Sequence, residues 1–126
     1  MNTKDIGTVG EDIVAKLLKR NRYKIVERNV HISHNEIDIV ARNKKFILFV
    51  EVKTRSTSEN SDLRFGTPAS AVDERKQKRT VEAARGFLKG GKYSGLQPRF
   101  DVAEVFICKE THKLIKINYI ENAFGA

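Results

Sequence analysis

Three ionised side chains occupy two strand-like segments at positions where a buried strand would carry apolar residues. Asp38 lies between two isoleucines, and Glu51 and Lys53 interrupt an apolar run that begins at Phe46. A carboxylate that is buried without a partner is strongly destabilising, so these residues need an opposite charge or a metal ion. Because all three fall within one predicted hairpin, they indicate a functional site.

The geometry of that hairpin places the charged side chains on one face of the sheet. Glu51 and Lys53 are two positions apart and leave the same face, because side chains alternate along a strand. If the two lysines between the strands form a two-residue loop, Asp38 lies directly opposite Glu51, with Cβ atoms about 4.5–5.5 Å apart. A four-residue loop would place Glu36 opposite Glu51 and Asp38 on the diagonal. Either loop keeps all four side chains on one face.

Carboxylates gathered at one end of a shared face repel one another, and a hard divalent cation relieves that repulsion. Mg²⁺ binds to one or two carboxylates together with water and phosphate oxygens. Lys53, beside the carboxylates, could hold a phosphate group or an attacking water. The combination is typical of metal-dependent phosphodiester hydrolysis.

The same residues resemble a nuclease signature. Asp38 followed by Glu51-Val52-Lys53 is similar to the PD-(D/E)xK motif, here without the proline. Six segments appear in order along the chain: Gly10-Glu11, Asn35-Glu36-Ile37-Asp38, Phe49 to Arg55, Phe65-Gly66-Thr67-Pro68, Ala71-Val72 followed by Lys76, and Phe100-Asp101-Val102. Together they resemble the YraN-like family of small bacterial predicted endonucleases, which is similar in core to archaeal Holliday junction resolvases. Asn35 stands where that family usually has glycine, and asparagine tolerates a left-handed backbone better than most residues.

The resemblance implies a fold, an activity and a set of site residues. The fold is an α/β restriction-endonuclease-like core, with a central mixed β-sheet flanked by helices. The activity is Mg²⁺- or Mn²⁺-dependent hydrolysis of DNA, including branched or junction DNA. Asp38, Glu51 and Glu11 would be the metal ligands, and Lys53 would complete the catalytic set. From the residues alone, Glu36 could be a further metal ligand, orient Lys53 or cap the strand entry, and His34 could contact DNA near the site; both are candidates for supporting the site from outside it.

Two other functions fit part of the sequence. A catalytically silent module of the same fold could hold DNA or RNA for a partner, but the intact set of Asp38, Glu51 and Lys53 speaks against a decayed site. A small basic RNA-binding protein of the ribosomal kind would explain the charge but not the buried carboxylates.

The charge of the chain is the second signal for nucleic acid. The formal net charge is +8, and between Arg75 and Arg99 eight basic residues face a single acidic one, Glu82. Such blocks suit phosphate contacts, which give affinity without base specificity. Lys76 falls within the apolar stripe of its predicted helix, so it either extends its stem to solvent or reaches the scissile phosphate, which we favour. The candidate phosphate contacts are Arg55, Lys76, Lys78 and Arg79.

Three residues near the predicted site allow alternative interpretations. Glu11 lies at the edge of the apolar stripe of the first helix, where periodicity alone favours a solvent-facing carboxylate and the family resemblance favours the site. His31 and His34 could suggest zinc, but a zinc site needs three or four ligands and the single cysteine, Cys108, is far along the chain.

The elements that must position these residues follow the order α-β-β-β-α-β-β. The first helix runs over 3–20, and strands follow over 23–32, 36–41 and 46–54. After a polar loop from Ser56 to Arg64, the second helix opens at Thr67 as N-cap and Pro68, runs to about Leu88 and ends at Gly90-Gly91. Strands over 99–108 and 113–120 complete a mixed sheet with helices on its faces.

Length and composition bound the class of protein. The 126 residues, 40% of them hydrophobic, suit one domain over 1–126. No apolar run approaches the roughly 20 residues of a membrane span, and no signal-peptide pattern opens the chain. A single cysteine leaves no intrachain disulfide and suits the cytoplasm. Cutting a symmetric junction would favour a two-fold homodimer.

Overall fold

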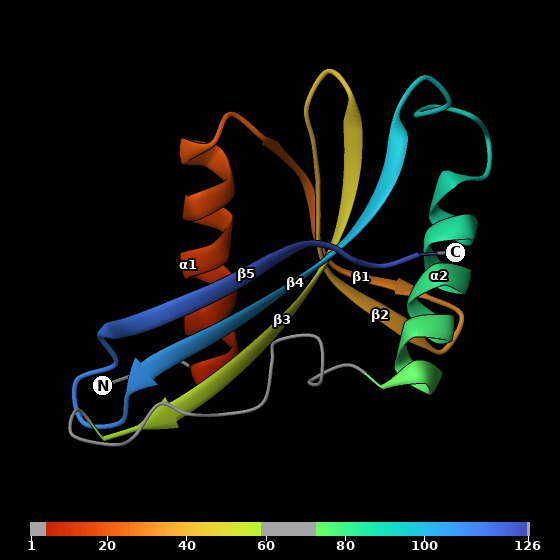
Figure 1. Ribbon diagram of the computed structural model, residues 1–126. Helices are drawn as coiled ribbons and strands as arrows, with labels where there is room; N and C mark the ends of the chain where they lie inside the picture. The colour runs from red at the N-terminus through yellow and green to blue at the C-terminus, as the bar shows by residue number, and fades with distance from the viewer. Residues whose placement is uncertain (1–4, 59–72, 126) are drawn as a thin grey trace.

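The computed structural model describes residues 5–58 and 73–125. Its element order confirms the predicted α-β-β-β-α-β-β arrangement (Figure 1). The elements are α1 (Ile6–Arg20), β1 (Lys24–Ile32), β2 (Asn35–Arg42), β3 (Phe46–Thr57), α2 (Glu74–Leu88), β4 (Gln97–Cys108) and β5 (Leu114–Phe124).

The strands form one mixed sheet in the order β1-β2-β3-β4-β5. Neighbouring strands are antiparallel except β3 and β4, which are parallel and therefore need a crossover; α2 lies within it. The two helices cover different faces of the sheet. One core cluster packs beneath α1 and includes Val14, Leu18, Leu48, Val50 and Val105; the other packs beneath α2 and includes Val40, Phe49, Val81, Ala84 and Phe100.

The second helix begins later than the sequence suggested. Asp73 has an extended backbone, with ψ 170°, and its side chain accepts a hydrogen bond from the Lys76 backbone N–H at 2.8 Å, so it is the N-cap of α2. A helix running without interruption from Thr67 is therefore wrong, while Thr67 and Pro68 themselves lie outside the described residues. The predicted end is confirmed, because Gly90 and Gly91 adopt positive φ angles just beyond Leu88.

Several other element boundaries in the structure also differ from those predicted from the sequence. β3 continues through Ser56 and Thr57, which the sequence placed in a loop, because both residues pair with β4. The rest of that loop, and the first residues of the predicted N-terminal helix, lie outside the described part of the chain. In the β1–β2 turn the left-handed residue is Ser33, with φ 55°, so the substitution of Asn35 for glycine needs no special backbone.

The sheet divides where β2 and β3 separate. These strands pair only from Ile39 opposite Val50 to Arg42 opposite Ile47, whereas β3 stays paired with β4 as far as Thr57. In Figure 1, the β1–β2 hairpin extends towards α2, while β3, β4 and β5 extend side by side to the other end of the molecule, across the lower part of α1. Neither described helix is long and apolar enough to cross a membrane.

Candidate active site

The loop between β2 and β3 fixes which acidic side chains face each other. Lys45 N–H and Phe46 N–H both donate to the Asn43 side-chain oxygen, at 2.8 and 2.7 Å, and this closes a tight turn. The observed register is the one expected for a two-residue loop. Ile39 is paired with Val50, so one position further along Asp38 lies opposite Glu51. The four-residue alternative, with Glu36 opposite Glu51, is wrong.

Asp38 lies at the point where the two strands separate. Its Oδ2 accepts a hydrogen bond from the Val52 backbone N–H at 2.8 Å, so the side chain takes the place of a ladder bond that β2 no longer makes. On β3, Phe49 packs beneath α2, and Glu51, two residues on, leaves the same face. We call Asp38 and Glu51 the acidic pair.

The acidic pair is held in an environment that disfavours its charge. Burial, followed by the charge of Glu51, raises the pKa of Asp38 to about 7, against the lowering effects of the Val52 N–H and of Lys76. Burial also raises the pKa of Glu51, while the nearby charge of Lys76 opposes the rise. Near neutral pH the pair therefore gains from any further positive charge.

Lys76 supplies part of that charge from the first turn of α2. Its Nζ lies 3.2 Å from Glu51 Oε1, and its side chain is 44% exposed against 13% for Glu51. The lysine thus points from the apolar stripe of the helix to the acidic pair, and the alternative of a stem that serves only to reach solvent is wrong. A phosphate contact for Lys76 stays a prediction.

Glu11 approaches the acidic pair from α1 because the residue before it is glycine. A Cβ at Gly10 would overlap the side chain of Thr54, so only glycine lets the helix come this close to β3. Burial, and then the charge of Asp38, raise the pKa of Glu11, and the charge of Arg28 opposes the rise. Glu11 is therefore within electrostatic reach of the acidic pair, on the side opposite Lys76's helix.

Asn29 links Glu11 to Glu36, a connection that the sequence did not suggest. With its side-chain amide turned to donate, Asn29 lies 3.2 Å from Glu11 Oε1 and 3.2 Å from Glu36 Oε1. Its backbone is left-handed, with φ 52°, which asparagine tolerates. Glu36 contributes to the high pKa of Asp38, although its side chain is exposed. Arg28 joins the group through Asp12 at 2.8 Å and Glu11 at 3.6 Å.

Lys53 and Arg55 continue the charged row along β3. Lys53 is exposed, and its charge lowers the pKa of Glu51. Its partner on β4 is Glu104, which is 1% exposed and accepts a hydrogen bond from Arg55 Nε at 2.6 Å. Sequence reasoning missed Glu104, although the signal was the same as for Asp38: an acidic residue within an otherwise apolar strand.

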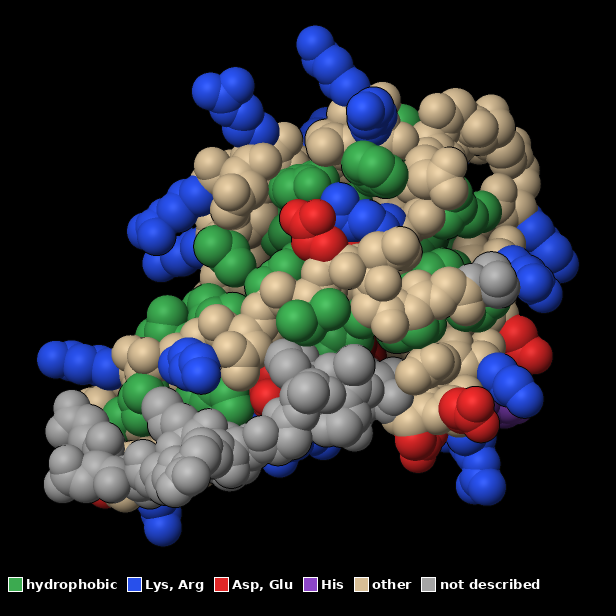
Figure 2. All heavy atoms as spheres, in the orientation of Figure 1, with side chains coloured by type: hydrophobic (Ala, Val, Ile, Leu, Met, Phe, Trp, Pro, Cys, Tyr) green, Lys and Arg blue, Asp and Glu red, His purple; other side chains and the backbone are tan. Residues whose placement is uncertain are grey.

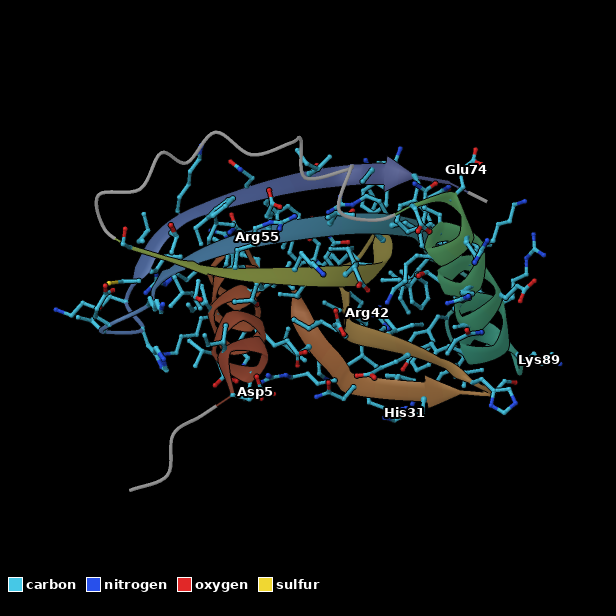
Figure 3. The ribbon with its side chains drawn as sticks, turned by 90° about the horizontal axis from the view of Figure 1, so that it is seen from below. Asp5, His31, Arg42, Arg55, Glu74 and Lys89 are labelled. Atoms are coloured by element: carbon cyan, nitrogen blue, oxygen red, sulfur yellow. The ribbon has the colours of Figure 1, made fainter. Side chains whose placement is uncertain are left out.

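The remaining predicted site residues lie apart from the acidic pair. Lys78 and Arg79 are exposed on α2, and His34 is exposed in the β1–β2 turn. In Figure 3, Arg55 lies on β3 and His31 lies far from it, at the end of β1 near Lys89. Arg99, counted in the basic block, is buried and bonded to Asp101, so its charge is already used within the fold.

The donor chemistry of the acidic pair fits a divalent cation. Within residues 5–58 and 73–125, no three His, Cys, Asp or Glu side chains form a ready metal cage. Mg²⁺ and Mn²⁺ do not need one, because they keep water and phosphate oxygens beside one or two carboxylates. The positively charged ammonium group of Lys76, 3.2 Å from Glu51 Oε1, already occupies a position at which the carboxylates favour a cation.

Comparisons with known proteins identify one family that matches most of the chain. The model of "Uncharacterised protein family UPF0102" matches residues 10–105, a span that includes every residue of the acidic site. A UPF0102 protein of Caldanaerobacter subterraneus subsp. tengcongensis is 44% identical over 124 residues, which cover 98% of each chain. A UPF0102 protein of Clostridium perfringens is 39% identical over 121 residues, or 96% of this chain and 94% of the relative.

Proposed function

The chain belongs to the UPF0102 family, the YraN-like family that its motifs resemble, and we propose that it is a metal-dependent nuclease that hydrolyses phosphodiester bonds in DNA. The observation that carries the proposal is the acidic pair, Asp38 and Glu51, which lies half-buried where β2 and β3 separate and is faced by Lys76. A protein that needed these carboxylates only for its fold would satisfy them with fixed hydrogen-bond donors.

Asp38 and Glu51 would hold Mg²⁺ or Mn²⁺ directly, with Glu11 as a further ligand from α1. A bound cation of this kind supplies polarisation of the scissile phosphate and lowers the pKa of a water molecule. Lys53 would orient the attacking water and stabilise the negative charge that develops on the phosphorus oxygens. Asn29 would hold Glu11 in place, since its amide reaches both Glu11 and Glu36.

Basic side chains around the site would bind the flanking phosphates. Arg55, fixed by Glu104, lies two residues beyond Lys53 on the same face of β3. Lys78 and Arg79 extend this surface over the exposed side of α2. Figure 2 shows lysine and arginine side chains projecting around much of the outline of one face of the molecule. Contacts of this kind suit a substrate recognised by backbone and shape, such as branched DNA, in the cytoplasm.

A silent binding module of the same fold is the second candidate. It is favoured by the ion pair between Lys76 and Glu51, which partly neutralises the acidic pair without any metal. The two candidates differ in metal affinity: the nuclease must bind Mn²⁺ through Asp38 and Glu51, and the silent module need not.

Incubation with Mn²⁺ and labelled DNA tests the proposal directly. The panel should contain linear, nicked, flapped and four-way branched DNA of one sequence, with Glu51→Gln as the control for contaminating nucleases. We expect cleavage of at least one substrate by the wild-type protein and none by the variant. Binding of all substrates without cleavage, together with no measurable Mn²⁺ affinity, would favour the silent module. Sedimentation with and without four-way DNA would show whether a homodimer forms.

A further inference from the structure

Lys76 occupies a position in its helix that is unfavourable for a cation. It lies in the first turn of α2, where the helix carries a partial positive charge, and its own backbone N–H is already bound to the capping Asp73. Asp73 and Glu74 offset part of this positive charge within the helix, and a carboxylate from another element offsets it further. Glu51 is that carboxylate, with its Oε1 3.2 Å from Lys76 Nζ.

The ion pair between Lys76 and Glu51 can break while the lysine takes another partner. The Lys76 side chain is 44% exposed, and its four-carbon stem lets the ammonium move without a change in the helix. The acidic pair, by contrast, is fixed, because Asp38 is held by Val52 and Glu51 is largely buried. Any movement between the two groups therefore belongs to the lysine.

We infer that Lys76 is an internal cation that holds the acidic pair while no metal is bound, and that it transfers to a substrate phosphate when a divalent cation takes its place. The inference rests on the proposed nuclease function and adds a coupling step to it. A divalent cation at Asp38 and Glu51 repels an ammonium at hydrogen-bond distance from the same oxygens. Lys76 is then released beside the site at which a phosphate would bind.

This exchange predicts effects of opposite sign on two ligands. Lys76 competes with the metal, so removing its charge should tighten metal binding. Lys76 also binds phosphate after release, so removing its charge should weaken DNA binding in the presence of metal. An ordinary phosphate contact would produce only the second effect, and a lysine that merely supports the fold would produce neither.

Mn²⁺ titration of Lys76→Met tests the first effect, because methionine keeps the length of the stem and removes the charge. We expect the dissociation constant for Mn²⁺, measured by calorimetry without DNA, to fall about three- to tenfold. Lys16→Met is the matched control, since it removes one exposed lysine charge that has no role in the proposed site. It should leave the dissociation constant within about twofold of the wild-type value, the size of a general charge effect. Circular dichroism before each titration confirms that both variants are folded.

Lysine acetylation followed by mass spectrometry tests the release itself. Saturating Mn²⁺ should increase the labelling of Lys76 several-fold relative to Lys78 in the same sample. Glu51→Gln should produce that increase without Mn²⁺, because the counter-charge is gone.

The outcomes separate this inference from the proposed function. If neither the wild-type protein nor Lys76→Met binds Mn²⁺ at millimolar concentration, the nuclease proposal fails and the exchange fails with it. If Mn²⁺ binds, but Lys76→Met binds it no more tightly and labelling of Lys76 does not rise, the exchange is wrong and the nuclease proposal stands.

Discussion

Two sets of carboxylates lie on neighbouring strands of the sheet, the fully buried Asp101 and the half-buried acidic pair, and they differ in how well their charges are satisfied. Asp101 of β4 is 0% exposed and pairs in register with Val50, the neighbour of Glu51, so Asp101 and Glu51 leave opposite faces. Asp101 accepts hydrogen bonds from the Tyr119 hydroxyl at 2.6 Å, the Asn122 N–H at 2.9 Å and Arg99 Nη2 at 2.8 Å.

The negative charge of Asp101 keeps its partners Arg99 and Tyr119 protonated, so that they continue to donate hydrogen bonds to it. Burial alone would lower the pKa of Arg99, yet the hydrogen bonds and charge of Asp101 raise it above its usual value. Burial and the charge of Asp101 likewise raise the pKa of Tyr119. With a guanidinium, a hydroxyl and a backbone N–H in place, this carboxylate has no need of a ligand.

The acidic pair shows the opposite arrangement. Besides each other, the two carboxyls have one described backbone N–H, one half-exposed lysine at hydrogen-bond distance and the charge of the exposed Lys53, and both have raised pKa values. A cavity of about 480 Å³ lies beside Arg99 and Tyr119, not beside the acidic pair. A larger cavity, of about 670 Å³, is lined by Asp73, Glu74, Arg75 and Lys78 at the start of α2. Since the described lining of neither cavity includes the acidic pair, unsatisfied charge is the better guide to a site for a cation.

The largest difference between the two sets should appear in activity. We expect Glu51→Gln to reduce cleavage of DNA with Mn²⁺ by about 10³-fold or more, because it removes a direct metal ligand. Its free energy of unfolding without metal should be unchanged or slightly higher, since one of two repelling carboxylates is gone. Rates from labelled DNA and urea unfolding of the same preparation check both statements.

Lys53→Ala is the companion variant for Glu51→Gln. It should abolish cleavage as well, but leave Mn²⁺ affinity nearly unchanged, because the lysine side chain is no metal ligand. Full activity in Lys53→Ala would show that the role assigned to this lysine is wrong.

Asp101→Asn should have its largest effect on stability instead. The substitution leaves Arg99 buried opposite a neutral group, and breaking a buried pair in this way typically costs about 3–5 kcal/mol. Urea unfolding should show the loss, and Mn²⁺ affinity should not change in the fraction that remains folded. A free energy of unfolding that is unchanged in Asp101→Asn, as it is expected to be in Glu51→Gln, would remove the contrast between the two sets.

Sequence reasoning found the acidic pair because an ionised residue in an apolar strand is visible without a structure. It left the loop between β2 and β3 open between two and four residues, and the observed register decides for two. Asn29 could not be found this way, because its role depends on a left-handed backbone that brings α1 and β1 together. Arg99 was counted with the basic block because a count of charges along the chain carries no information on which of them are buried.

The next largest difference between the two sets should appear in the pH dependence of the free energy of unfolding. Because the pKa of Asp38 is raised to about 7, the folded protein keeps a proton that the unfolded chain releases between about pH 4 and pH 7. The contribution of this group to stability is therefore present at the acidic end and is lost as the pH rises towards 7. We expect wild type to lose on the order of 1–2 kcal/mol more than Asp38→Asn over this range. Parallel curves in urea unfolding would contradict it.

The smallest effect, on salt dependence, tests which surface of the molecule meets DNA. Arg79 lies exposed on α2, which packs on the face that carries the acidic pair, whereas Lys16 lies exposed on α1, which packs on the other face. If DNA binds along α2, Arg79→Ala should flatten the plot of log K against log salt concentration by about one unit on duplex DNA, while Lys16→Ala should leave the slope unchanged. Affinity should fall alike for all sequences, because a phosphate contact reads no base. Fluorescence anisotropy over a range of salt concentrations measures both slopes. Equal flattening by the two variants would mean that charge attracts DNA from all sides, and that the position of the acidic pair does not direct how DNA binds.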